Sequence, residues 1–414
     1  MIKKFIFSLL MLSIIPLVSA STMPLVKIGG KLYDSLEEAI NAASENDTIS
    51  LISDIKLEDT LRINKTVNIN LNGNDISADE KVFEIKGGFL TLSGKGTIKE
   101  TKPNYGAIML VGSNNPTDEK YSVVKVGSDV TLEGWSGIFI NHESSKSYGV
   151  VAYLDGKINA IDDISGGSGA GIYVNGKIQD ETSHPVINIT DNAEIKSTGT
   201  GLYIAGYSTF YIGDAYIEGI KSAIGIKSGK LIIDGATVIC NGEDKTPTEG
   251  YNNGIKSSGT TIQIESNNGY AGNIEIDISR GTFKSKNSNA IYEYIGKGSN
   301  SKIYSMSISG GNFKSGKNKD VFSFSNSFKD IHSGFISGGK YSTNPTNYLK
   351  SGYTVINDEM YEVVKSTVKQ INTINKTIQN KNRFIKSLII LLIPLIIIII
   401  YFNREKIIKI FKRM

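Results

Sequence analysis

Cysteine and histidine are scarce in this chain of 414 residues, which holds one Cys and three His. A single Cys excludes a disulfide framework and any metal site built from several thiolates. That residue, Cys240, follows Val238 and Ile239 and is expected to be a small buried hydrophobe. Three His leave too few imidazoles for a typical zinc centre. With 43 Gly and 40% hydrophobic residues, the chain is neither collagen-like nor wholly disordered.

Long apolar runs are found at the two ends of the chain. Residues 1–20 are typical of a secretory signal peptide: two lysines precede an apolar stretch from Phe5 to Val18, and a small-residue cleavage site ends at Ala20. The alternative is an uncleaved anchor helix, for which this apolar stretch is short.

Residues 384–402 are predicted to form a transmembrane helix, because 19 residues span about 28 Å of helix. A buried core helix is the alternative, and the five consecutive isoleucines of 396–400 disfavour it. The tail, 403–414, carries five cations against one acid, so it is expected to remain cytoplasmic. No Leu-Pro-x-Thr-Gly sorting motif precedes the helix. These features predict a single-pass protein of the cell membrane with an extracellular N-terminal part.

The overall charge of +4 comes from these ends. Without them, residues 21–383 have a small excess of acids. A nucleic-acid partner would require a basic stripe, so none is predicted.

A short pattern recurs through the middle of the chain, where the 3.6-residue period of amphipathic helices is absent. It consists of a small residue and an alternating strand, as in Gly171-Ile172-Tyr173-Val174. The corresponding Ile and Leu residues are spaced by 22 to 36 positions, at 108, 138, 172, 202, 224, 255 and 291. Repeats of this length made of short strands predict an all-β fold, a parallel β-helix over 21–364. A β-sandwich is the alternative.

Two flanking segments are predicted around this solenoid. Ser35-Leu36-Glu37-Glu38 is a capping box, so residues 35–44 are expected to form an amphipathic helix that caps the first coil. Residues 365–383 are interpreted as a stalk, either helical or a solvated linker.

The opening and closing segments carry a family resemblance. Tyr33 to Ile40, Asp47-Thr48-Ile49 and Leu71-Asn72-Gly73 resemble the start of right-handed β-helix proteins of the pectin-lyase-like superfamily. The closing Ile336 to Tyr341 resembles the last coils of Gram-positive bacterial surface proteins. The resemblance covers about 27–364 and implies the fold and a surface location. It implies no single function, because the superfamily holds polysaccharide lyases, hydrolases and adhesins.

Residues for catalysis are few. The lyases of this superfamily use an Arg or Lys base, but the predicted solenoid, 21–364, holds only Arg62 and Arg280. Of the hydrolase motifs, only an Asp-Asp pair, Asp162-Asp163, is present. These two acids are the catalytic candidates, although solvated turn residues are the simpler interpretation. A polysaccharide-degrading enzyme therefore remains the alternative function.

Four acids recur in one turn of the repeat: Asp155, Asp191, Asp214 and Asp234. Stacked carboxylates are oxygen ligands that suit Ca²⁺. Bonds from Asp side chains to the turn backbone explain the same pattern without a metal, so no cofactor is predicted and Ca²⁺ is the alternative.

An outward stripe is the main prediction for a binding site. Inward Ile and Val residues require Tyr173 to point outward, because side chains alternate along a strand. The same logic applies to the other members of the stripe, which are Met109, Phe139, Tyr203 and Tyr292. An exposed apolar stripe marks a contact surface, unless loops fold over it. The sequence thus predicts a surface protein that displays a binding face for a polysaccharide or a surface protein, as in adhesion; no oligomeric state is predicted.

Overall fold

The computed structural model describes residues 23–366, apart from 103, 119, 162–168, 184, 246–258, 268 and 297–299. The chain divides into two units, the first made of Met1–Lys350 and Val355–Val363 and the second of Ser351–Thr354 and Val364–Met414. Within the second unit, the structure describes residues 351–354 and 364–366. All surfaces discussed below belong to the first unit.

The predicted signal peptide, transmembrane helix and basic tail lie outside the described residues, as does nearly all of the stalk. Within the described part, no helix is long and apolar enough to cross a membrane.

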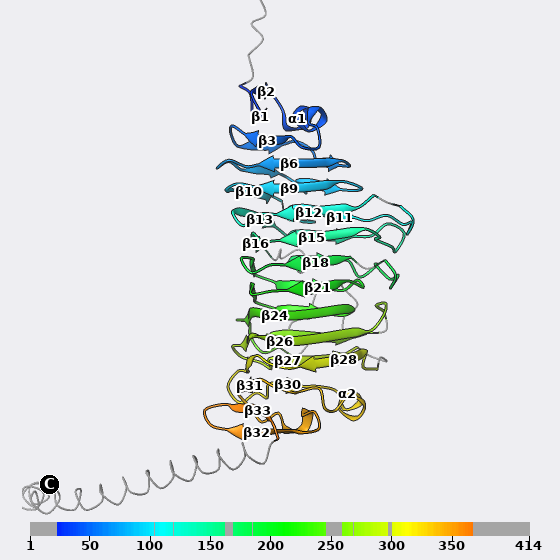
Figure 1. The fold of residues 1–414 in the computed structure, drawn as a ribbon, viewed down its shortest axis with the longest axis vertical. Helices are drawn as coiled ribbons and strands as arrows, with labels where there is room; N and C mark the ends of the chain where they lie inside the picture. The colour runs from blue at the N-terminus through cyan, green and yellow to red at the C-terminus, as the bar shows by residue number, and fades with distance from the viewer. Residues whose placement is uncertain are drawn as a thin grey trace, which may run out of the picture. The chain divides into compact units, whose positions relative to one another are not determined.

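The first unit is built from parallel strands that stack into three ladders (Figure 1). Successive strands of the chain enter the ladders in turn, so three strands make one coil. Ladder 1 contains β3 (Thr48–Leu51), β6 (Thr66–Asn70), β9 (Phe89–Ser93), β12 (Ser122–Val126), β15 (Val150–Leu154), β18 (Val186–Ile189), β21 (Thr209–Ile212), the first halves of β24 (Gly229–Cys240) and β26 (Ile274–Ser285), and β28 (Ile303–Ile308).

Ladder 2 follows ladder 1 across a tight turn in each coil. It contains β4 (Ile55–Leu57), β7 (Ile76–Ala78), β10 (Gly96–Glu100), β13 (Val130–Gly134), β16 (Lys157–Ala160), β19 (Glu194–Ser197), β22 (Tyr216–Gly219), the second halves of β24 and β26, β29 (Asn312–Lys314) and β31 (Lys340–Tyr341).

Ladder 3 is a separate ten-stranded sheet. It contains β5 (Leu61–Ile63), β8 (Phe83–Ile85), β11 (Ile108–Val111), β14 (Ser136–Asn141), β17 (Ala170–Val174), β20 (Thr200–Ile204), β23 (Ser222–Ile226), β25 (Ile262–Ser266), β27 (Ile291–Ile295) and β30 (Phe322–Ser323). The fold is therefore a predominantly β solenoid of parallel strands, compatible with a β-helix. A β-sandwich has antiparallel sheets and does not fit this pairing.

The repeated aliphatic residues form the interior of the solenoid. Ile138, Ile172, Leu202 and Ile224 pair in register across four coils, and none of them is exposed. A β-carbon added at Gly171 would lie 2.2 Å from the Ile195 side chain. Each repeat begins with a small residue because the strand there passes this close to the packed interior.

Short elements flank the ladders at the two ends of the unit. At the first coil, β1 (Val26–Ile28) pairs antiparallel with β2 (Lys31–Tyr33) and with β3. Helix α1 (Leu36–Ala42) begins where the Ser35 hydroxyl accepts a hydrogen bond from the Glu38 N–H at 3.1 Å. The remaining elements are α2 (Asn326–Ile331), the 3-10 helix η1 (Thr346–Tyr348), β32 (Tyr353–Asn357) and β33 (Tyr361–Lys365).

Candidate binding surfaces

The residues of the predicted stripe share one column on ladder 3. Met109 pairs with Phe139, Phe139 with Tyr173, and Tyr173 with Tyr203. The rings of Phe139 and Tyr173 stack at 5.0 Å, and those of Tyr173 and Tyr203 at 4.5 Å. The predicted alignment is confirmed for these four residues. Tyr292 lies in the same column but three coils beyond Tyr203, after Gly225 and Gln263. It therefore does not join the stack.

The predicted exposure of this stripe is wrong. Phe139, Tyr173 and Tyr203 are 6%, 3% and 1% exposed, and Met109 is also buried. They belong to a hydrophobic cluster outside the solenoid interior that also contains Trp135, Ala170 and Ala205, with Val111 and Tyr270 packed against it. Loops between the coils thus cover the stripe, and its aromatic faces are not available to a ligand in this conformation.

The turn that carries Tyr270 provides part of this cover. This turn belongs to the loop after β25 and reaches back over earlier coils. There the Gln179 side chain donates a hydrogen bond to the Gly269 carbonyl at 3.3 Å. The Lys302 ammonium donates to the Tyr270 carbonyl at 2.5 Å. Burial lowers the pKa of Lys302 to about 8, against a smaller opposing effect of the Glu181 carboxylate.

A buried ion pair lies beneath the same turn. The Lys227 ammonium is 2.8 Å from the Glu265 carboxylate and donates a hydrogen bond to the Tyr270 hydroxyl at 3.1 Å. It also lies 5.2 Å and 4.8 Å from the ring centres of Tyr203 and Tyr270. Burial is the largest single effect and would lower the pKa of Lys227, but the Glu265 carboxylate and the Tyr270 hydroxyl together outweigh it, and the pKa is raised. Lys227 is therefore charged, and its side chain is only 2% exposed.

The four turn acids are engaged by protein donors. Asp155 accepts a hydrogen bond from Asn192 at 3.1 Å, and Asp191 accepts one from the backbone N–H of Asp214 at 3.0 Å. Arg280 bridges Asp214 and Asp234, with N–O distances of 2.6 and 2.8 Å. Among the described residues, no three His, Cys, Asp or Glu side chains are placed to share a metal ion. Each of these bonds joins an acid to a residue of another coil, so the acids hold neighbouring turns together.

The catalytic candidates Asp162 and Asp163 lie outside the described residues. Cys240 is buried as predicted, and burial raises the pKa of its free thiol to about 11.

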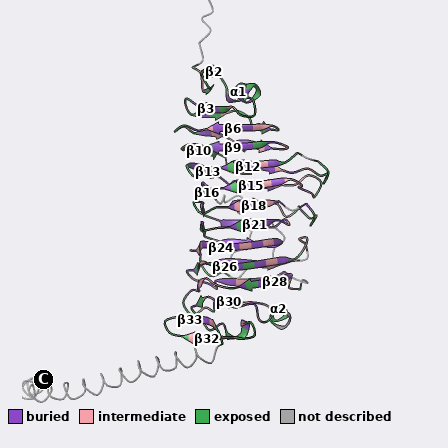
Figure 2. Cartoon of the chain, in the orientation of Figure 1, coloured by how far each residue is buried: buried purple, intermediate pink, exposed green. Residues whose placement is uncertain are grey.

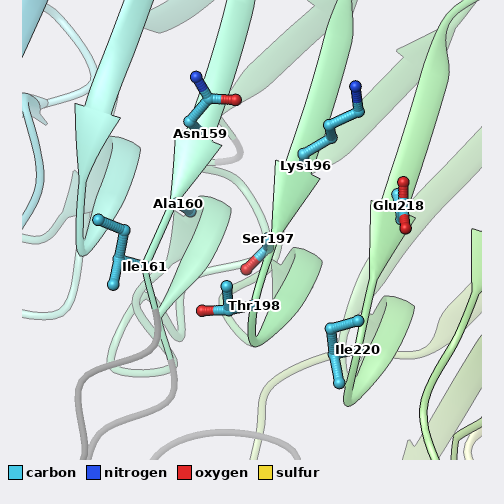
Figure 3. A pocket seen from close by; sticks show the side chains of 8 residues that line it. All are labelled: Asn159, Ala160, Ile161, Lys196, Ser197, Thr198, Glu218 and Ile220. Atoms are coloured by element: carbon cyan, nitrogen blue, oxygen red, sulfur yellow. The ribbon is translucent and has the colours of Figure 1, made fainter.

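A pocket of about 290 Å³ lies at the corner between ladders 2 and 3 (Figure 3). Asn159, Lys196 and Glu218 occupy one row on successive strands, since they pair in register. Ile161 and Ile220 line the neighbouring row and are 48% and 43% exposed. The pocket thus combines polar side chains with an accessible apolar wall, the combination typical of small-ligand sites.

The two charged groups that line this pocket, Lys196 and Glu218, are paired with residues beside it. The Lys196 ammonium contacts Glu194, and this hydrogen bond lowers the pKa of the Glu194 carboxyl. Glu218 accepts hydrogen bonds from Tyr216 at 2.6 Å and from Asn241 at 2.5 Å. Burial, aided by Glu218, raises the pKa of Tyr216 to about 12. Glycoside hydrolysis needs a carboxyl that stays protonated, and Glu194 does not meet this requirement.

The outer face of ladder 1 carries the exposed aromatic residues that sequence reasoning missed. Phe89, Tyr153 and Tyr211 are 38%, 42% and 47% exposed. Tyr153 pairs with Asn188, which pairs with Tyr211, so the two rings are two coils apart, about 10 Å at the usual strand spacing. Phe89 lies in the neighbouring column, which continues through Val123, Val151 and Val186. We call these residues with Asn188 the ladder-1 face; the strands that carry it combine buried, intermediate and exposed residues (Figure 2).

Comparison with known protein families, with curated proteins and with solved structures finds no match for this chain. The ladder-1 face and the corner pocket are therefore judged on their geometry alone.

Proposed function

We propose that this chain is a cell-surface protein that binds a polysaccharide, or the surface of another cell, through the ladder-1 face. In this proposal the solenoid is a right-handed parallel β-helix similar to the pectin-lyase-like superfamily. It is exported by residues 1–20 and anchored by 384–402, with the C-terminus in the cytoplasm. Helix α1 caps the first coil.

One observation carries the binding proposal: Tyr153 and Tyr211 are exposed in one column of the parallel strands of ladder 1. Flat aromatic rings supply apolar contact area for sugar rings, and the Asn188 amide between them can donate and accept hydrogen bonds. The half-buried valines beside them extend the apolar area. An accessible apolar patch of this kind is typical of a contact surface.

The hydrogen bonds and ion pair of the acids at the corner pocket favour binding over catalysis. Glu218 of the corner pocket is hydrogen-bonded by Tyr216 and Asn241, and Glu194 beside the pocket is paired with Lys196, so these acids are suited to orienting a ligand. A polysaccharide lyase or hydrolase remains the alternative, with Asp162 and Asp163 as its candidates.

Affinity electrophoresis of the full-length protein, in gels cast with neutral or acidic polysaccharides, tests the proposal. We expect retardation by at least one polysaccharide without cleavage of the polymer. Tyr153→Ala with Tyr211→Ala is expected to raise the Kd at least about tenfold, or about 1.4 kcal/mol. The matched control is Tyr304→Ala, which removes a ring that is 63% exposed on β28, three coils beyond Tyr211.

Each other result contradicts part of the proposal. A zone of cleaved polymer would establish the enzyme instead. Equal retardation of the double variant and the control would place the binding surface elsewhere. No retardation by any polysaccharide would exclude the glycan and leave a protein surface as the ligand.

A further inference from the structure

The first coil leaves two of its three strands with an open edge. Strand β3 has neighbours on both sides, β1 and β6. Among the described residues, β4 pairs only with β7 and β5 only with β8. Helix α1 packs near β1 and β2 at this end of the unit (Figure 1). Open strand edges are sites where another strand can add.

The backbone of Arg62 points to the open side of β5. The Leu61 N–H donates to the Val82 carbonyl at 3.0 Å, and the Ile63 carbonyl accepts from the Lys86 N–H at 3.0 Å. These two residues therefore use their backbone groups on the β8 side. Because alternate residues of a parallel strand bond in opposite directions, the N–H and C=O of Arg62 face away from the sheet.

Arg62 lines a cleft of about 820 Å³. It lies between α1 and the stretch from β4 to β5, and its apolar lining includes Leu36, Ile40 and Ile55, all buried. A cleft that runs beside an open strand edge has the shape required to take an extended peptide.

The unpaired charge of the cleft is negative. Arg62 and Lys81 pair with Glu84 at 3.9 and 3.4 Å, and Lys56 pairs with Asp79 at 3.5 Å. Four further acids line the cleft and form no ion pair with any described residue: Glu37, Glu58, Asp59 and Glu80. Charge complementarity therefore selects a basic occupant.

We propose that this cleft binds an extended, lysine-rich segment of a partner protein, which adds as a strand to the edge of β5. The Arg62 N–H and C=O make the main-chain hydrogen bonds. Alternate side chains of the segment face helix α1 or reach Glu37, Glu58 and Asp59. This site is separate from the ladder-1 face and takes a different class of ligand.

Proline at position 62 tests the proposed hydrogen bonds directly. Arg62→Pro removes the outward N–H, whereas Arg62→Ala removes the same side chain and keeps the N–H. Proline is tolerated on an edge strand when its position bonds to no neighbour. The probe is a fluorescent, end-capped octapeptide of alternating Lys and Val, measured by fluorescence anisotropy with the full-length protein in detergent.

We expect the Lys-Val peptide to bind the wild type and the alanine variant alike, and the proline variant at least about tenfold more weakly. The charge control is an octapeptide in which Glu replaces each Lys. This Glu-Val peptide is expected to bind at least about tenfold more weakly than the Lys-Val peptide, because the acids that line the cleft repel it. A Lys-Val peptide N-methylated at alternate residues, tested on the wild type, is expected to lose binding as well, which covers the case of a misfolded proline variant. Equal binding of the methylated peptide, equal binding of the two charge types, or no wild-type binding at millimolar concentration would overturn the proposal.

Discussion

Glu265→Gln is expected to lower the free energy of unfolding by about 3–5 kcal/mol. The substitution removes the Glu265 carboxylate, which lies 2.8 Å from the Lys227 ammonium at a site where the Lys227 side chain is 2% exposed. The Tyr270 hydroxyl and the two tyrosine rings remain, but neutral groups do not replace a charge. Urea unfolding of the full-length protein measures the loss, with the fluorescence of Trp135, the single Trp of the chain, as a probe within the same cluster.

A surface ion pair provides the matched control. Lys230 and Glu275 lie 3.1 Å apart with side chains 41% and 31% exposed, so Glu275→Gln is expected to cost less than about 1 kcal/mol. Lys227→Met combined with Glu265→Leu removes both charges and is expected to restore most of the stability. A loss at Glu265 no larger than that at Glu275 would mean that water reaches Lys227 and that the cover opens.

Tyr203→Ala is expected to lower the free energy of unfolding by about 3–5 kcal/mol, as for other large buried aromatics. Its ring is 1% exposed and stacks on Tyr173 at 4.5 Å, so its removal leaves a cavity beneath Tyr270. The same urea titration measures this effect. Tyr203→Leu keeps part of the volume and is expected to lose less.

Tyr211→Ala is the contrasting variant on the ladder-1 face. Because Tyr211 is 47% exposed, its removal is expected to change stability by no more than about 0.5 kcal/mol. Tyr203 should thus affect stability and Tyr211 ligand affinity. If Tyr203→Ala is as stable as the wild type, the stripe on ladder 3 is not covered in solution, and the sequence-based interpretation of it as a binding face regains support.

The sequence was sufficient to predict the strand ladders because their signal is local. A small residue followed by alternating Ile or Val recurs at each coil, and stacking Ile138, Ile172 and Leu202 buries all three side chains. Alternation also placed Phe139 and Tyr173 on the outer side of their strands, in one column.

Their burial was not predictable, since it depends on contacts far apart in the chain. Gln179 and Gly269 are 90 positions apart, and no repeat signals their hydrogen bond. The ladder-1 face was missed although the same alternation signals it. In Ala152-Tyr153-Leu154 and Phe210-Tyr211-Ile212, the tyrosine lies between two buried residues. The turns after ladder 1 are tight, so no loop covers these rings within the described residues.

Chemical labelling of tyrosines tests the central claim most directly, because the two aromatic columns differ in accessibility. The full-length protein is treated with tetranitromethane, with and without the polysaccharide that retards it, and nitration is mapped by mass spectrometry. We predict that Tyr153 and Tyr211 are nitrated in the free protein and protected by the polysaccharide, while Tyr173 and Tyr203 stay unmodified in both samples. Nitration of Tyr173 and Tyr203 in the free protein, with their protection by the polysaccharide, would contradict the claim and return the binding face to ladder 3.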